Sequence, residues 1–443
     1  MNTTRQKITL PGFLFLLLSL AACQRPEVEP TPEEALDQMY SYVQDLYIWY
    51  DRLPSAAELA PRSLADPNAL VAKVRTYSPL TTSGAHVDRW SYVTTTQNYQ
   101  NQQQGKVTGR FGFGYSYLTD TLTYVRFVLP GSPLDLAGVK RGWRIYSVNG
   151  IAATVANAPR VTAALAESQA VEFRFVRPDG TSQTSSLARA DFTTSPILTY
   201  RVLEVNGRKL GYVAVNEFTN KLETDILTVF QAFKDQGGIS DLVVDLRYNG
   251  GGTIKSATQL ASIIAPPSAL NKKFFEYVYN DKNTKRNTTV NLSPVNGGAT
   301  SWGLSRVFFI TTVGTASASE MLINGLQPYL KTITVGTRTH GKPVGMVGGT
   351  IGQHIIFPIS FRTVNANGDG DYFEGIPVDK EQFDDLTHDF GDPQEACLAD
   401  VLNYLRTGTL PARKSARLGQ SAAVERANQQ LYEEPRLKGA LDF

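Results

Sequence analysis

Ser317 has the surroundings that a serine nucleophile requires. It lies between an apolar run at 307–312 and a helical pattern at 319–330, in a segment of small residues. Small residues let the chain turn sharply and place a hydroxyl at a helix N-terminus, where free N–H groups stabilise developing negative charge. The N–H of Ala318 can then supply one donor to an oxyanion. By itself, however, Ser317-x-x-Glu320 is also a capping box, which many inert helices carry.

Lys342 follows the next expected strand, at 332–336, so its loop can return to the same edge of a sheet. A free lysine titrates near pH 10.4 and serves as a general base only if burial or a neighbouring cation lowers its pKa to roughly 7–8. A lysine in a loop is usually solvated. A catalytic role for Lys342 is therefore indicated only in combination with the neighbouring motifs.

Three consecutive glycines at 250–252 follow a continuous apolar strand at 241–246. Glycine permits positive φ and close backbone approach. An N–H of Gly251, or of its neighbour Gly250, can therefore form an oxyanion hole with that of Ala318. The loop lacks the Gly-Lys-Ser/Thr of a Walker motif and the Gly-x-Gly-x-x-Gly dinucleotide fingerprint, so phosphate binding is not indicated.

These segments, in this order, resemble the C-terminal processing peptidases, the S41 group. The shared motifs are Asp-Leu-Arg-x-Asn-Gly-Gly-Gly at 245–252, Thr-Ala-Ser-Ala-Ser-Glu at 315–320 and Gly-Lys at 341–342. Glu-Gly-Ile-Pro-Val-Asp at 374–379 resembles the segment that closes their catalytic domain. The resemblance covers residues 105–385 and implies an α/β catalytic domain of the crotonase-like or ClpP-like kind, with no cofactor.

The resemblance also implies roles for individual residues. Ser317 would be the nucleophile and Lys342 the general base of peptide-bond hydrolysis through an acyl-enzyme. Many members carry a glutamine four residues after the lysine, which orients it, and here that position is Met346. Gln353 from the following strand could substitute for the glutamine, or packing alone could hold the lysine. A serine–histidine variant that uses His340 is a further alternative.

Residues 105–192 have the order of a PDZ domain. Glycine alternates with aromatic residues at 111–115, Gly-Ser-Pro precedes a short helix near 134–138, and a later strand closes on Asn-Gly at 149–150. In such a domain the glycine loop offers N–H groups to a peptide carboxylate, and the adjoining strand edge pairs with the peptide. A small β domain without a ligand is the alternative. The predicted peptide-binding residues are Phe113, Gly114 and Tyr115.

The N-terminal residues have the pattern of a secretory signal. Arg5 and Lys7 precede an apolar run at 10–22, which is shorter than the roughly 20 residues of a membrane-spanning helix. The run ends in Leu-Ala-Ala before Cys23, a sequence that resembles a bacterial lipobox. We therefore expect Cys23 to carry lipid that anchors the protein to a membrane. By the same resemblance, Gln24 in the next position favours the outer membrane of the cell envelope.

The predicted fold is a multidomain protein of α/β and β classes. Helical periodicity in the N-terminal part and alternating strands and helices after residue 193 support this division. The predicted parts are a signal peptide at 1–23, a tether at 24–33, an N-terminal helical domain at 34–104, a PDZ-like domain at 105–192, a catalytic domain at 193–392 and a helical C-terminal segment at 393–443.

Composition narrows the possible partners. The chain has 43 Lys and Arg against 41 Asp and Glu in 443 residues, with no basic stripe, so nucleic acid is not expected to bind. The four histidines lack metal-site spacing, so no metal is expected. If Cys23 carries lipid, Cys397 is the one remaining cysteine, which we interpret as a small core residue.

Polypeptides are the expected substrates, in particular unfolded or tail-exposed proteins of the envelope. Two alternatives remain open from the sequence. One is a peptide-binding lipoprotein with an inactive centre, for which Met346 is the supporting feature. The other is an amidase or esterase that uses the same serine.

Overall fold

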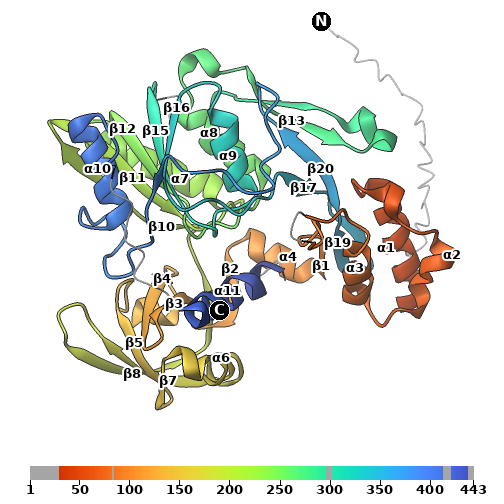
Figure 1. Cartoon of the computed structure of the whole chain (residues 1–443), viewed down its shortest axis with the longest axis horizontal. Helices are drawn as coiled ribbons and strands as arrows, with labels where there is room; N and C mark the ends of the chain where they lie inside the picture. The colour runs from red at the N-terminus through yellow and green to blue at the C-terminus, as the bar shows by residue number, and fades with distance from the viewer. Residues whose placement is uncertain (1–28, 82–83, 296–301, 413–420, 438–443) are drawn as a thin grey trace, which may run out of the picture.

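The computed structural model describes residues 29–81, 84–295, 302–412 and 421–437. Cys23, the predicted signal peptide and residues 24–28 of the predicted tether lie outside this range. A large α/β body carries a smaller β domain at one end and N-terminal helices at another (Figure 1). Among the described residues, no helix is both long and apolar enough to cross a membrane.

The α/β body is built on a six-stranded sheet in the order β10-β11-β12-β15-β16-β21. Every pair is parallel except β10 with β11. The strands are β10 (Ile197–Val205), β11 (Arg208–Val215), β12 (Asp241–Asp245), β15 (Arg306–Thr311), β16 (Lys331–Gly336) and β21 (Lys380–Glu381).

Helices cover both faces of this sheet. On one face α7 (Leu222–Asp235), α8 (Ile254–Ile264) and α9 (Ala318–Leu326) bury Val244 and the side chains that alternate with it. On the other face α10 (Ala396–Thr407) packs over the intervening side chains, such as Val243. Burial of both faces explains why β12 and β15 read as continuous apolar runs rather than as alternating patterns.

Residues 105–192 form a separate β domain, here called the small β domain. Its sheet has the order β3-β4-β5-β7-β8, with β6 paired to β5, so that β3 is an edge strand. The strands are β3 (Phe113–Thr119), β4 (Leu122–Val128), β5 (Arg144–Val148), β6 (Ile151–Ala152), β7 (Ala170–Val176) and β8 (Ser182–Ala188). The helices are α5 (Pro133–Leu136) and α6 (Ala158–Glu167), and the paired strands β2 (Lys106–Arg110) and β9 (Ala190–Thr193) join the domain to the rest.

The N-terminal region ends near the predicted boundary at residue 104, but it shares its core with the α/β body and does not form a separate helical domain. Its helices are α1 (Pro32–Leu46), α2 (Ala56–Leu59), α3 (Pro67–Arg75) and α4 (Thr96–Gln103), and its strand is β1 (Tyr92–Thr95). Strand β1 pairs with β19 (His354–Phe357), which pairs with β18 (Gly349–Ile351). The apolar face of α1 packs on α3 and also shares a core with Val344, Ile356 and Ile359.

A second sheet extends from the body toward these helices, in the order β14-β13-β20-β17. Its strands are β13 (Lys273–Tyr279), β14 (Thr289–Asn291), β17 (Val344–Met346) and β20 (Ile359–Val364). Strands β17 to β20 directly follow the loop that carries Lys342. The N-terminal region therefore helps to hold that loop in place.

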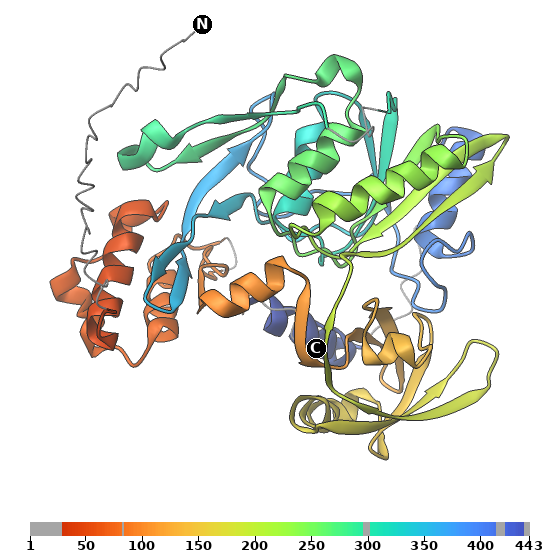
Figure 2. The same ribbon diagram turned by 180° about the vertical axis from the view of Figure 1, so that it is seen from behind.

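The described residues of the predicted C-terminal segment form two helices, which lie on two different parts of the protein. Helix α10 lies on the central sheet and buries Cys397, which is 2% exposed, so the interpretation of this cysteine as a core residue is confirmed. Helix α11 (Ala422–Leu437) lies against β3 of the small β domain (Figure 2).

A buried ionic network joins the small β domain to the α/β body. The guanidinium of Arg247 pairs with Asp245 at 2.8 Å, Glu395 at 2.9 Å and Asp384 at 2.6 Å. Asp384 also pairs with Arg141 of the small β domain at 2.6 Å. Burial by itself would raise the pKa of Asp384, but the charges of Arg141 and Arg247 outweigh it and hold the pKa well below the usual carboxyl range.

Replacing Asp384 with asparagine removes the negative charge that Arg141 and Arg247 share, and both of these arginines are buried. We expect Asp384→Asn to lower the free energy of unfolding at pH 7 by about 3 to 5 kcal/mol in urea titrations. Because the folded pKa is depressed, the contribution of Asp384 is present above the unfolded pKa of about 3.9 and is lost as the pH falls below it. The difference between wild type and variant should therefore shrink below about pH 4.

Asp371→Asn is the matched control, because Asp371 pairs with Arg362 at the surface and is 76% exposed. Its effect should stay within about 1 kcal/mol. Equal effects of the two substitutions would show that the buried network does not hold the two parts together.

Candidate active site

Ser317 lies at the turn from β15 into α9 and has φ 57° and ψ −117°. Non-glycine residues seldom adopt this conformation, which costs of order 1–3 kcal/mol and persists only where surrounding contacts impose it. Thr315 provides one such contact, since its Oγ1 donates to the carbonyl of Leu246 at 2.7 Å. Thr312 provides another, since its Oγ1 donates to the carbonyl of Arg247. A strained strand-to-helix turn of this kind presents a serine hydroxyl to solvent.

The glycine loop is packed directly against Ser317. Gly251 has φ 107°, and a Cβ at that position would lie 2.8 Å from Cβ of Ser317, so only glycine fits. Asn249 joins the loop to the turn, because its carbonyl accepts from the Ala316 N–H and from Ser319 Oγ, both at 3.0 Å. The loop that follows β12 and the turn that follows β15 thus form one unit at the carboxyl edge of the sheet.

The N–H of Gly251 is already engaged, since it donates to Oδ1 of Asn249 at 2.9 Å. Of the two glycines predicted for the oxyanion hole, the geometry therefore favours Gly250. Both glycines line the same cleft as Ser317. Ala318, which follows Ser317, is the first residue of α9. A donor from Gly250 beside the N–H of Ala318 is the arrangement that the chemistry needs.

Glu320 connects the serine turn to the lysine loop. Its Oε2 accepts from the backbone N–H of Ser317 at 2.9 Å and from that of Lys342 at 2.8 Å. Its Oε1 accepts from Oγ1 of Thr339 and the N–H of Gly341, both at 2.6 Å. The side chain is fully buried. Burial raises the pKa of Glu320, and these four hydrogen bonds oppose that rise.

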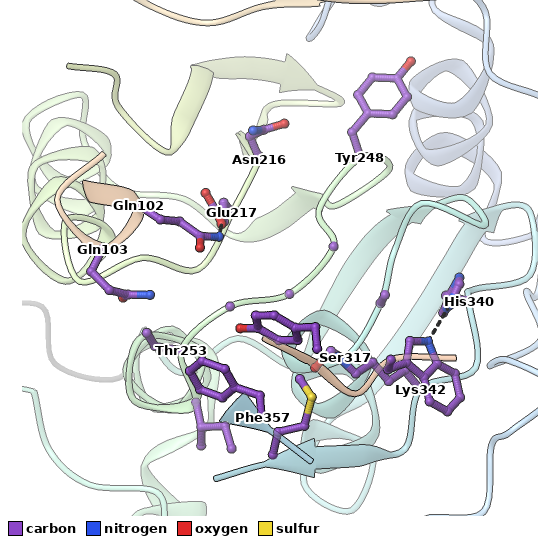
Figure 3. A pocket seen from close by; sticks show the side chains of 18 of the residues that line it. Gln102, Gln103, Asn216, Glu217, Tyr248, Thr253, Ser317, His340, Lys342 and Phe357 are labelled. Carbon is purple, nitrogen blue, oxygen red and sulfur yellow. Dashed lines mark hydrogen bonds between the residues drawn. The ribbon is translucent and has the colours of Figure 1, made fainter. Parts of the chain in front are cut away.

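Ser317 and Lys342 line one cleft of about 460 Å³ (Figure 3). Both side chains are partly exposed and thus accessible to a ligand. Met346 is also part of the lining of this cleft. Met346 ends β17 and stands where the resemblance led us to expect an orienting glutamine.

Gln353 lies in the turn between β18 and β19, not in a strand as predicted. It is exposed, and its carbonyl accepts from the N–H of Thr96 at 2.9 Å. Gln353 is absent from the lining of the cleft that holds Lys342. The structure therefore gives no support to Gln353 as the residue that orients the lysine.

His340 also lines the cleft, but one ring nitrogen is occupied. Nε1–H of Trp90 donates to Nε2 of His340 at 2.9 Å, as the dashed line in Figure 3 shows. That nitrogen cannot accept a proton from Ser317 unless the bond to Trp90 breaks. The geometry thus favours Lys342 over His340 as the base.

The sequence did not single out several other residues that line the cleft, among them Tyr92, Glu217 and Phe357. Tyr92 stacks on Phe357 with ring centroids 4.7 Å apart, and Glu217 accepts from Nε2 of Gln102 at 2.7 Å. Burial raises the pKa of Glu217 to about 7, so the cleft lining gains a negative charge at this residue as the pH rises through neutrality. Glu217 could have been suspected because it follows β11 at the carboxyl edge of the sheet, where α/β proteins place their sites.

The residues predicted to bind peptide belong to the small β domain. Phe113 and Tyr115 are each 2% exposed and pack in its core. Gly114 lies against the ring of Phe127, where a Cβ would come within 2.4 Å. These three residues can therefore contact a peptide chiefly through the backbone of β3. Phe113 also lines the cleft that contains Ser317.

Residues 209–377 match Peptidase family S41, a range that contains Ser317, Glu320 and Lys342. The chain carries a peptidase family S41 domain. It is 25% identical over 218 residues to a carboxyl-terminal-processing protease of Picosynechococcus, and 25% identical over 217 residues to one of Synechocystis. These matches cover 48% of this chain and 49% and 48% of the two relatives, so about half of each relative is spanned.

The fold is also found in a crystal structure of a Bacteroides fragilis protein that is provisionally described as an S41 protease. The two structures align with a TM-score of 0.66 at 24% identity, over 86% of this chain and 98% of the other. The predicted combination of α/β and β parts is thereby confirmed.

Glu320→Gln should loosen the connection between the serine turn and the lysine loop, because an amide group cannot accept all four hydrogen bonds. We expect the rate at which a fluorophosphonate labels Ser317 to fall about 100-fold. Stability should fall by about 1 to 3 kcal/mol, since buried donors lose their acceptor. Labelling is compared at equal folded fraction, verified by circular dichroism.

Glu58→Gln is the control, because Glu58 accepts from the Ser55 N–H at 2.9 Å in an exposed capping box of the same spacing. It should change labelling little and stability by less than about 0.5 kcal/mol. Unchanged labelling of Glu320→Gln would contradict the positioning role of this carboxylate.

Proposed function

We propose that this protein is a serine endopeptidase of the C-terminal processing type, with Ser317 as nucleophile and Lys342 as general base. The observation that carries the proposal is the shared acceptor, since the N–H groups of both residues donate to Oε2 of Glu320. Both side chains also line one partly open cleft beside a glycine loop. This is the constellation of nucleophile, base and oxyanion donors that acyl transfer needs.

The reaction follows from this arrangement. Oγ of Ser317 attacks the scissile carbonyl while the neutral amine of Lys342 accepts its proton. The N–H groups of Ala318 and Gly250 bind the oxyanion, and the lysine ammonium then protonates the leaving amine. Water hydrolyses the acyl-enzyme with Lys342 again acting as base, which returns the serine to its free form.

The cleft suits a polypeptide substrate. Its lining includes the aromatic residues Tyr92, Tyr99 and Phe357, and it extends to Phe127 of the small β domain. We propose that the small β domain acts as a PDZ-like module, which binds the exposed C-terminus of a substrate along the edge of β3. The two carboxyl-terminal-processing relatives support this substrate class.

We also propose that the protein is lipid-anchored at Cys23 in the cell envelope, at the outer membrane. The support is the lipobox-like sequence that ends at this cysteine. Metabolic labelling with an alkyne-bearing fatty acid should mark the wild type and lose its signal in Cys23→Ser. Equal labelling of both would contradict the anchor, and neither outcome bears on Ser317.

The enzymatic proposal is tested by fluorophosphonate labelling with casein cleavage measured in parallel. Ser317→Ala and Lys342→Ala should each lower the rate of casein cleavage roughly a thousandfold or more. The reason is that loss of either member of a nucleophile–base pair removes the catalytic effect of both. Lys255→Ala is the control for loss of a lysine, since Lys255 is 80% exposed and stands outside the cleft lining. It should retain wild-type activity.

A folded wild type that neither labels nor cleaves, with or without a C-terminal peptide, would support a peptide-binding protein instead. Labelling without cleavage of casein, but with hydrolysis of small esters or amides, would support an esterase or amidase.

A further inference from the structure

Helix α11 lies on the edge of the small β domain where a peptide strand would add. Strand β3 is the edge strand of that sheet, and α11 packs against it (Figures 1 and 2). An exposed strand edge takes an added peptide through its unpaired N–H and C=O groups. The C-terminal helix of this chain therefore stands in the place of a ligand.

One face of α11 is buried in the core of the small β domain. Val424, Ala427 and Leu431 are 0%, 7% and 7% exposed and join the apolar cluster that contains Tyr115. Their spacing of three and four residues places them on one side of the helix. Between them, Asn428 is half-buried, whereas the other residues, such as Gln430, are exposed. The helix is thus held by a narrow apolar stripe.

Asn428 forms the contacts that an added strand would form. Its Nδ2 donates to the carbonyl of Tyr117 at 2.7 Å, and its Oδ1 accepts from the N–H of Tyr117 at 2.9 Å. One side-chain amide thereby satisfies both backbone groups of a residue in the edge strand. Near the start of α11, Oγ of Ser421 donates to Oδ1 of Asp120 at 2.7 Å, just beyond the end of β3.

The same helix reaches the catalytic cleft. Leu431 belongs to the core of the small β domain and also lines the cleft that holds Ser317 and Lys342. An occupant of the β3 edge therefore also covers part of the wall of the cleft that contains the proposed nucleophile. Displacement of α11 would free both surfaces at once.

We propose that α11 is an internal, displaceable occupant of the peptide-binding edge, which a substrate C-terminus must replace before it can enter the cleft. This inference rests on the proposed function for the identity of the ligand. The contacts of α11 in the described part of the chain include three apolar side chains and the hydrogen bonds of Asn428 and Ser421. Such an attachment opens at low cost compared with unfolding of the domain. Only molecules in which α11 is undocked can bind a peptide at this edge. The apparent affinity for the peptide is therefore the intrinsic affinity multiplied by the undocked fraction.

The test uses the full chain in detergent, with Ser317→Ala in every sample so that no cleavage occurs. The probe is a fluorescein-labelled decapeptide that ends in an apolar residue with a free carboxylate, and its C-terminally amidated form is the ligand control. Ala427→Asp puts a charge into the buried stripe and should release α11. We expect it to tighten binding of the probe about tenfold or more in fluorescence anisotropy. Asn428→Ala should act in the same direction with a smaller effect.

Gln430→Asp is the matched control, because it adds the same charge to the exposed face of α11 and should leave the affinity unchanged. Hydrogen exchange of residues 113–119 provides a second measurement. Exchange should quicken in Ala427→Asp and slow again when the probe is added, which also verifies that the domain remains folded.

Equal or weaker binding in both Ala427→Asp and Asn428→Ala would overturn the proposal and make α11 a fixed part of the domain. Because every sample lacks the Ser317 hydroxyl, the result does not depend on catalysis. Tighter binding combined with an unreactive Ser317 in the wild type would uphold the occupancy of β3 and reject the peptidase function.

Discussion

The buried carboxylate of Glu320 is the interaction on which the site depends. One of its oxygens accepts from both the Ser317 and the Lys342 N–H groups, so it fixes two loops that follow different strands. A buried carboxylate is tolerated only when its acceptor sites are filled, and here four donors fill them. The residue that completes a capping box is thus also the link between the proposed nucleophile and its base.

The rest of the fold supports this link from three sides. Asn249 joins the glycine loop to the serine turn, and Arg247 anchors the same segment to α10 through Glu395. Arg141 extends that network into the small β domain. The N-terminal helices pack on Val344 and the strands after it, which secures the lysine loop. Buried polar or apolar contacts therefore connect the α/β body, the small β domain and the N-terminal region to the loops of the cleft.

Local sequence was sufficient to predict the main strands and helices and the site residues that belong to recognisable motifs. The apolar runs predicted β12 and β15 within one residue at each end, and motif spacing brought Ser317 and Lys342 to one cleft. Long-range pairings were not predictable, because nothing near Tyr92 in the sequence specifies Phe357 as its partner. For the same reason Gln353 was misplaced, since its hairpin is positioned by distant contacts. The docking of α11 likewise depends on residues some 300 positions away.

The pH dependence of fluorophosphonate labelling shows whether Lys342 is the base for Ser317. If it is, the labelling rate of the wild type rises through a midpoint of roughly pH 7–8. This rise should disappear in Lys342→Ala. A rate that rises only near pH 10.4, where free lysine titrates, would contradict the role of Lys342. An identical profile in Lys342→Ala would contradict it as well.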